Sequence, residues 1–430
     1  MLDRTKAPEI RPFGRLSIPD EHTETLSNGL VLHTLFGGDQ DVARLNIIAD
    51  GGTYDCARQC TASFAAELLR EGNSKSDSET IADIVDYNGA WFNSFTSSHH
   101  TSMQLSALSS KLVTLAPTMI DCLTAPTFPA EAFEIIRGKG AAKQRLNLSR
   151  VSFLSAADNR RMSAGASHPE SRIPTPDEIE ATSRDCLIDF HRQILNSRHI
   201  HAYLCGRVSN QDLSQLCRLL EQIDGRDCIS PVNIVPYAPE APGISRIDRP
   251  GSLQCAVTMS IPAIPRYHPD YNLLRMTVTA LGGYFGSRLM MNIREDKGYT
   301  YGISAALLGA REGGCTVISA QCDNSHAGAL IDETRAELVR MAEVPLDDDE
   351  LRRLKFNVAS DLASTLDTPM TMMDYYELRR TVGVPDDYFY ARQKALAEIS
   401  PEIVCEMARR YLNPEALRIS VAGDLSKSDL

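Results

Sequence analysis

The sequence has no run of about 18 apolar residues, the minimum for a helix that crosses a bilayer, so we expect no membrane span. Its first residues, MLDRTKAPEIRPFGRL, lack the apolar stretch of a secretory signal, which predicts a cytoplasmic location. The eleven cysteines include no C-x-x-C pair. Scattered cysteines in odd number favour buried thiols in a reducing compartment over a disulfide framework.

Positive charge is also in short supply. The chain has 44 Lys and Arg against 56 Asp and Glu, a net charge of -12. Nonspecific binding to nucleic acid or to an anionic membrane depends on basic patches, so we expect neither partner. What remains is the composition of a soluble globular protein, and 430 residues are enough for two or more domains.

An internal repeat gives the organisation of the chain. Residues 177–209 align without gaps on residues 394–426, at an offset of 217. Both copies predict a helix that starts at acidic residues, an alternating strand and a closing glycine. The identical pairs are Ser183/Ser400, Arg192/Arg409, Leu195/Leu412, Asn196/Asn413, Gly206/Gly423 and Ser209/Ser426.

The repeat predicts two homologous α+β domains, each an antiparallel-rich sheet covered by helices, which face each other like a clam shell. We place the N-terminal domain at 1–222 and the C-terminal domain at 251–430. Between them, 223–250 reads as a linker because it holds five prolines. Strands are expected at 30–35 and 43–48, and helices at 61–70, 111–122, 130–146, 271–281, 327–341 and 348–363.

Several motifs then resemble one family in this order along the chain: Gly51-Gly52, the strand GAWFNSFT at 89–96, His168-Pro169, and LGGYFGSRLMMNIREDKGYTYGISA. Together they resemble the pitrilysin, insulinase and mitochondrial processing peptidase family of zinc peptidases, over about residues 20 to 426. The resemblance implies a peptidase fold in which two homologous halves enclose the substrate.

The zinc site of that family is missing. Family peptidases carry H-x-x-E-H on the first helix, two imidazole ligands with a glutamate base. Ser63, Ala66 and Glu67 stand at those three positions. The further glutamate ligand should fall at residues 142–144, which are Ala, Lys and Gln. One glutamate does not hold zinc, so we expect no metal or other cofactor on this chain.

Other histidines were considered as replacement ligands. His99 and His100 are neighbours on a predicted strand, so their side chains should point to opposite faces. His199 and His201 share a face, but an H-x-H at the end of a domain is more often surface or core than metal site.

The second half keeps a pair that the resemblance implies is catalytic. Arg294 and Tyr301 are spaced as the family's arginine and tyrosine, which face the zinc across the chamber. A guanidinium and a phenol can donate hydrogen bonds to the oxygen that gains charge when a peptide carbonyl is attacked. The alternative is that Arg294 pairs with a neighbouring carboxylate while Tyr301 packs on a strand.

Asn93, with Phe92 and Ser94 beside it, lies where the family's edge strand receives an extended peptide through main-chain pairing. An asparagine that only satisfies a local turn is the alternative. Ser94 replaces the alanine usual in the family.

The leading hypothesis is therefore the non-zinc subunit of a two-chain peptidase for unstructured peptides. A paralogous partner would supply zinc, and this chain would supply Arg294, Tyr301 and half of the chamber. A homodimer is left open for the isolated chain. The alternatives are an inactive assembly or peptide-binding protein, and a peptidase with an unrecognised site of its own.

Overall fold

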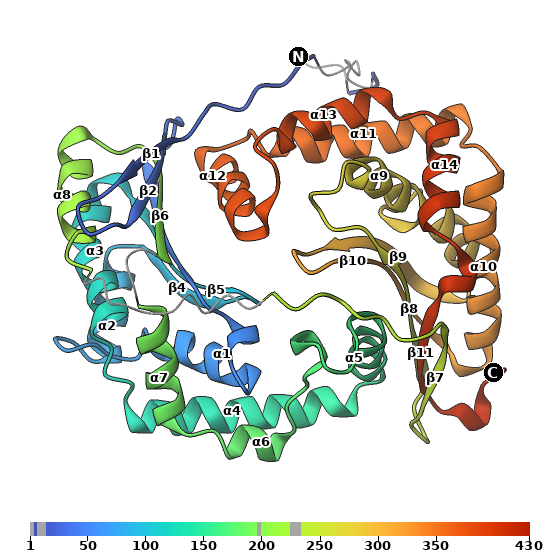
Figure 1. The fold of residues 1–430 in the computed structure, drawn as a ribbon, viewed down its shortest axis with the longest axis horizontal. Coiled ribbons are helices and arrows are strands. Elements are labelled where there is room, and N and C mark those ends of the chain that lie inside the picture. Colours follow the sequence, from blue (N-terminus) through green and yellow to red (C-terminus); the bar gives the residue numbers. More distant parts are fainter. Residues whose placement is uncertain (1–3, 7–13, 196–198, 224–233) are drawn as a thin grey trace.

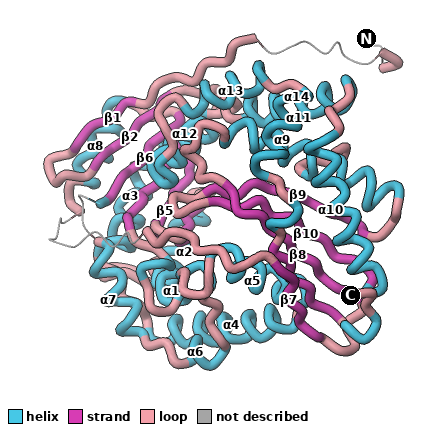
Figure 2. Tube along the Cα trace, turned by 45° about the vertical axis from the view of Figure 1, so that its right-hand side comes forward, coloured by secondary structure: helices cyan, strands magenta, loops and turns pink. Residues whose placement is uncertain are grey.

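The computed structural model describes residues 4–6, 14–195, 199–223 and 234–430. Two sheets, each with its own helices, stand at opposite sides of the molecule (Figures 1 and 2). This is the duplicated α+β architecture that the repeat predicts. No helix in the described parts is long and apolar enough to cross a membrane.

The first sheet has six strands within the described residues, in the order β1-β2-β6-β3-β5-β4. β2 and β6 are parallel, and the other neighbours are antiparallel. The strands are β1 His22–Thr25, β2 Val31–Phe36, β3 Val42–Asp50, β4 Trp91–Thr96, β5 His100–Leu108 and β6 Ile200–Gly206.

The second sheet repeats this topology without a counterpart of β1, in the order β7-β11-β8-β10-β9. Its one parallel pair, β7 with β11, corresponds to β2 with β6. The strands are β7 Gly243–Asp248, β8 Gln254–Ala263, β9 Thr300–Gly309, β10 Gly314–Asp323 and β11 Arg418–Gly423.

The helices cover the sheets and join the two units along the top and bottom of the view in Figure 1. The first half contains α1 Gln59–Leu68, α2 Ser78–Tyr87, α3 Ser109–Thr124, α4 Ala130–Ser149, α5 Val151–Ala164, α6 Pro176–Glu180, α7 Arg184–Ile194 and α8 Asn210–Leu220. The second half contains α9 Tyr271–Gly282, α10 Ala327–Glu343, α11 Asp348–Ser364, α12 Pro369–Leu378, α13 Tyr388–Glu398 and α14 Pro401–Tyr411.

Apart from residues 196–198, which lie outside the described residues, the aligned segments have the same order of helix and strand at the predicted offset. α7 and α14 each begin after a serine whose hydroxyl oxygen accepts a hydrogen bond from a backbone N–H of the first turn, Ser183 and Ser400. The closing glycines Gly206 and Gly423 end equivalent strands, and a Cβ at either would lie 2.3 to 2.4 Å from atoms of the neighbouring strand. The cap and the close packing explain why these residues occur in both copies.

The predicted linker needs a correction. Range 223–250 contains β7, which pairs with β11 at the edge of the second sheet. The prolines at 242 and 250 flank this strand and do not interrupt it. The C-terminal unit thus includes residues from Gly243 onward, while Pro231 lies outside the described residues.

The two units exchange one helix each. α5 comes from the first half but packs on β8 and β11 of the second sheet, and α12 comes from the second half but packs on β2 and β6 of the first. Asn159 on α5 donates from Nδ2 to the carbonyls of Arg418, at 2.8 Å, and Thr258, at 3.1 Å. Because Asn159 is buried, these bonds join the units inside the protein.

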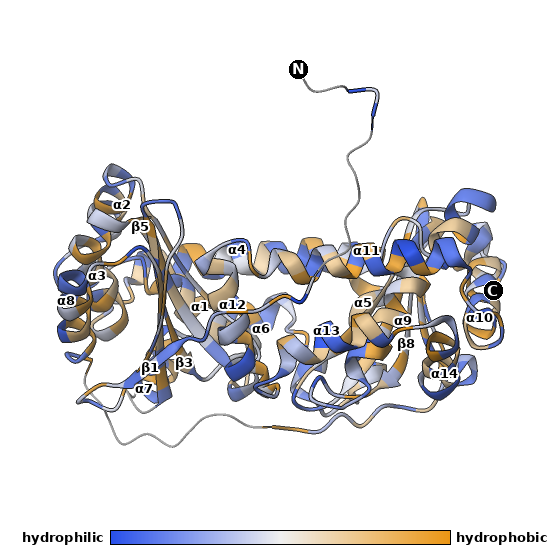
Figure 3. Ribbon diagram, turned by 90° about the horizontal axis from the view of Figure 1, so that it is seen from above, coloured by the Kyte–Doolittle hydropathy of each residue, from blue (hydrophilic) through white to orange (hydrophobic). Residues whose placement is uncertain are grey.

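Apolar residues are concentrated in the strands and on the helix faces against them (Figure 3). One core cluster belongs to the first unit alone. The other fills the second unit and continues through α12 to Leu35, Ile48 and Tyr203 on the first sheet. The second core therefore contains side chains from both halves.

Candidate functional site

Arg294 and Tyr301 are brought together by a π-helical segment, Met290–Asp296, and the first residues of β9. Arg294 Nε donates to the backbone carbonyl of Tyr301 at 3.0 Å. The guanidinium also pairs with Glu295 and lies 4.7 Å from the ring centroid of Phe285. The side chain of Tyr301 is 92% exposed. The arginine is thus held to the strand, and the phenol remains free to meet another molecule.

β4 is an edge strand, as the resemblance implies, and its side chains alternate between two faces. Trp91, Asn93 and Phe95 are exposed on one face, and Phe92 is buried on the other. Ser94 Oγ donates to the carbonyl of Ala66 on α1 at 2.6 Å. Asn93 therefore presents its side chain to solvent, with an exposed aromatic residue two positions away on either side.

Beside β4 lies a groove of about 490 Å³, formed between α2 and the strand. Trp91, Phe92 and Asn93 line one wall, and Ile81 and Val85 of α2 lie opposite. The carbonyl of Phe92 accepts a hydrogen bond from Arg70 Nη1 at 3.0 Å. A peptide that pairs with this edge would compete with Arg70 for the carbonyl of Phe92.

The positions of the family's metal ligands do not fit zinc. On α1, Ser63 and Glu67 are exposed, while Ala66 is buried and its carbonyl is occupied by Ser94. Gln144 on α4 is buried and donates from Nε2 to the carbonyl of Pro174 at 2.8 Å. In the described chain, no three His, Cys, Asp or Glu side chains are grouped to hold a metal ion. Ala66 therefore serves packing, and Gln144 serves a helix-to-loop contact.

His99 and His100 are both buried, and their ring centroids are 6.3 Å apart at 82°. His99 Nε2 pairs with Glu312 of the second unit, while His100 Nε2 lies 3.5 Å from Asp50. The two rings therefore contact different acids. Burial, together with the charge of Arg380, lowers the pKa of His100 to about 3.

His199 and His201 likewise have separate partners. His201 Nδ1 lies 2.9 Å from His33 Nε2, whereas His199 Nδ1 lies 3.9 Å from Asp50. Burial and the nearby Arg380 lower the pKa of His201 to about 3, so this ring is neutral at pH 7. These side chains form part of the contact between the first sheet and the segment that follows α12.

The units also meet at the turns of their equivalent hairpins, β4–β5 and β9–β10, where His99 pairs with Glu312. A cavity of about 350 Å³ lies there, lined from both sides. Tyr54 and Glu170 come from the first half, and Arg266 and Arg311 from the second. Burial lowers the pKa of Arg311. No sequence motif indicated this cavity.

The structure thus brings Arg294 to Tyr301 and Ser94 to Ala66, but it places the two groups on different sheets. β4 is the edge of the first sheet and β9 is the edge of the second. The contacts of Arg294 with Glu295 and Phe285 were not predicted individually, although a neighbouring carboxylate was one of the alternatives. Trp91 carries a signal that sequence reasoning missed, because it is the one tryptophan of the chain and lies beside Asn93.

Fold and site together define a two-unit α+β protein of peptidase architecture without the metal ligands. A family model described as "Peptidase M16 inactive domain" matches residues 181–358. An uncharacterized zinc protease of Streptomyces coelicolor is 24% identical over 378 residues, which cover 84% of this chain and 80% of that protein.

Solved structures agree on the fold. The peptidase M16 inactive domain from Pseudomonas fluorescens has a TM-score of 0.86 at 20% identity, covering 94% of this chain and 98% of that one. A protease from Helicobacter pylori has a TM-score of 0.86 at 15% identity, covering 95% of this chain and 100% of the other. The chain is therefore similar to the M16 inactive domain in sequence over residues 181–358 and in fold over nearly its whole length, and its missing zinc motif is consistent with the inactive type of domain.

Proposed function

We propose that this chain is the non-zinc-binding subunit of a two-chain peptidase that acts on unstructured peptides. A paralogous subunit carries the zinc and the glutamate base, and this chain contributes Arg294, Tyr301 and half of the chamber. The main support is the contrast between its two halves. Ser63, Ala66 and Glu67 occupy the metal positions, whereas the phenol of Tyr301 is 92% exposed beside an anchored guanidinium.

In this proposal each group of the chain has a defined task. The hydroxyl of Tyr301 donates a hydrogen bond to the carbonyl oxygen of the scissile peptide as negative charge develops on it. Arg294 fixes the start of β9 through the carbonyl of Tyr301 and adds positive charge nearby. The edge of β4 holds the peptide in an extended conformation, with Asn93 facing the substrate. A peptide held between two subunits is also positioned for attack.

The test combines the chain with the zinc-bearing paralogue and a quenched fluorescent peptide. Tyr301→Phe removes one donor and should lower kcat about a hundredfold, with folding and zinc content of the complex unchanged. Arg294→Lys keeps the charge but loses the planar fork, so it should be nearly as harmful. Tyr299→Phe is the matched control, because the ring of Tyr299 stacks on His326 at 4.8 Å and the substitution keeps that contact.

Binding at β4 has its own measurement. Trp91 is the single tryptophan and is 70% exposed, so its fluorescence reports directly on this edge. An uncleaved peptide should shift the emission of the isolated chain, and Asn93→Asp should weaken the binding. Wild-type turnover in both the Tyr301→Phe and Arg294→Lys complexes would refute the catalytic role.

The second candidate is an inactive assembly or peptide-binding subunit. One observation favours it: the guanidinium of Arg294 is already engaged by Glu295, Phe285 and a carbonyl of its own chain. In that case Trp91 would still report peptide binding, while turnover would not depend on Tyr301. A cytoplasmic location is part of either proposal, and the free thiols of all the described cysteines are compatible with it.

A further inference from the structure

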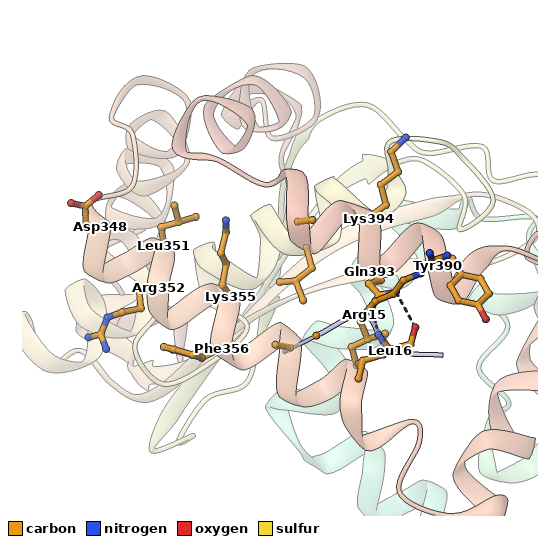
Figure 4. A pocket seen from close by; sticks show the side chains of 15 residues that line it. Arg15, Leu16, Asp348, Leu351, Arg352, Lys355, Phe356, Tyr390, Gln393 and Lys394 are labelled. Carbon is orange, nitrogen blue, oxygen red and sulfur yellow. Dashed lines mark hydrogen bonds between the residues drawn. The ribbon is translucent and has the colours of Figure 1, made fainter. Parts of the chain in front are cut away.

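A groove of about 810 Å³ lies between α11 and α13 (Figure 4). None of its lining residues belongs to the edge strands β4 and β9. Its floor is apolar, and much of it comes from residues of α11. The apolar lining is Leu351, Phe356, Ala359, Leu362, Leu396 and Ala397. Phe356 is only half-buried, so an aromatic ring remains available inside the groove.

One end of the groove is already occupied by an extended segment of this chain. The side-chain amide of Gln393 on α13 accepts from the N–H of Leu16 at 2.5 Å and donates to its carbonyl at 3.1 Å. A carboxamide has one acceptor and one donor group, which match the two main-chain groups of one extended residue. The contact shows that α13 can hold one extended residue through main-chain hydrogen bonds.

The rim of the groove is basic in a protein whose net charge is -12. Arg15, Arg352, Lys355 and Lys394 surround the apolar floor, and Asp348 lies at the far end of α11 (Figure 4). Arg352 pairs with Asp349, and Lys394 lies 3.8 Å from Glu398. Within the described residues, Arg15 and Lys355 have no ion pair. Two cations next to an apolar floor favour a ligand with carboxylates and aliphatic side chains.

We propose that this groove binds an extended segment of a partner protein in which aliphatic and acidic residues alternate. The aliphatic side chains contact Phe356 and Leu351, and the carboxylates pair with Lys355 and Arg15. Peptide grooves combine an apolar floor with a few polar groups in this way. The proposal does not depend on the peptidase function, because the groove lies outside β4, Arg294 and Tyr301.

Charge argues against the chain's own first residues as the occupant. Residues 1–13 contain three basic residues, at 4, 6 and 11, against two acidic ones, at 3 and 9. Their net charge of +1 does not complement a basic rim. A second copy of the chain is a separate case, because its presence would make the oligomeric state depend on the groove.

The test is fluorescence anisotropy with the full chain and three labelled, capped nine-residue peptides. The first alternates Leu and Glu, the second replaces Glu by Lys, and the third replaces Leu by Ser. The Leu/Glu peptide should bind at least tenfold more tightly than either of the others. Lys355→Glu should weaken its binding about tenfold, and Phe356→Ser should do the same. Lys111→Glu, an exposed charge reversal on α3, is the matched control and should have no effect.

Two further measurements decide between occupants. An unlabelled peptide of residues 1–16 should not displace the Leu/Glu probe at equal concentration. If it displaces the probe more effectively than unlabelled Leu/Glu peptide does, the groove belongs to the chain's own segment and the proposal is wrong. Equal binding of all three probes, or a dimer in sedimentation that Lys355→Glu dissociates, would also overturn it.

Discussion

Glu377 is a largely buried acid, with its side chain 16% exposed, at the contact between α12 and the first sheet. Its replacement by glutamine offers a quantitative test of that contact. Its carboxylate accepts a hydrogen bond from Asn46 Nδ2 at 2.9 Å and lies 3.5 Å from Arg44 Nη2. Burial raises the pKa of Glu377 to about 7, although Arg44 and Asn46 oppose the shift. Desolvation of the charged form therefore outweighs its two partners.

The sign of the effect follows from proton binding. In the unfolded chain the carboxyl group has its ordinary pKa of 4.5, so between that value and about 7 the folded protein binds more protons. The associated stability is fully present below pH 4.5 and is lost as the pH rises through about 7. The full difference corresponds to about 3 kcal/mol, at about 1.4 kcal/mol per pH unit.

Glu377→Gln keeps an acceptor for Asn46 but cannot ionise. The free energy of unfolding of the variant, relative to wild type, should therefore rise by up to about 3 kcal/mol between pH 4.5 and pH 8. Urea unfolding of both proteins at several pH values measures this difference. The contributions of the other titrating groups to the free energy of unfolding are the same in both proteins and cancel. Glu343→Gln, at the exposed end of α10, controls for the loss of one charge. A wild-type-to-variant difference that stays constant with pH would refute the reasoning.

Three other predictions concern packing and the lost metal site. Asn159→Ala removes two buried hydrogen bonds between α5 and the second sheet, so the free energy of unfolding should fall by about 1 to 3 kcal/mol. The control Ser149→Ala, at the exposed end of α4, should change the free energy of unfolding only slightly. Gly140→Ala brings a Cβ to 2.5 Å from Phe64 Cζ and should lower the melting temperature, whereas Gly138→Ala, with nothing within 4 Å, should raise it. The purified chain should contain no stoichiometric zinc by elemental analysis. The triple variant Ser63→His, Ala66→Glu, Glu67→His should not create a stable zinc site either, because Ala66 is 1% exposed and Gln144 is committed to Pro174. One zinc per chain in either protein would contradict this prediction.

The repeat could be predicted from sequence because its informative residues have local tasks. Ser183 and Ser400 start helices, Gly206 and Gly423 end strands, and each task depends on neighbours close in the chain or directly across a strand. Amphipathic spacing located the long helices for the same reason. β7 was missed because it is an edge strand, which pairs on one side only and tolerates the prolines around it.

The candidate site was predictable only in part. The seven-residue spacing of Arg294 and Tyr301 indicated that they are close, but it could not tell that the guanidinium binds the carbonyl of Tyr301 and leaves the phenol exposed. That arrangement depends on the π-helical segment and on the ring of Phe285, which lies before that segment in the chain. Contacts of this kind are set by tertiary structure and not by residue spacing.

The sequence also did not predict that α5 and α12 each pack on the sheet of the other half. This exchange of helices affects how the protein can work with a partner. The polar residues of α5, Ser155, Asn159 and Ser163, recur at four-residue spacing, which defines one helix face but not the sheet that receives it. All three bond to the second sheet. Helix α12 returns to the first sheet through Glu377. Opening the two halves would break the hydrogen bonds at both contacts, at a net cost of about 0.5 to 1.5 kcal/mol each, and would expose the apolar core that the halves share. We therefore expect β4 and Tyr301 to keep their relative positions, so that a zinc-bearing subunit would close around this chain as a preformed half of the chamber.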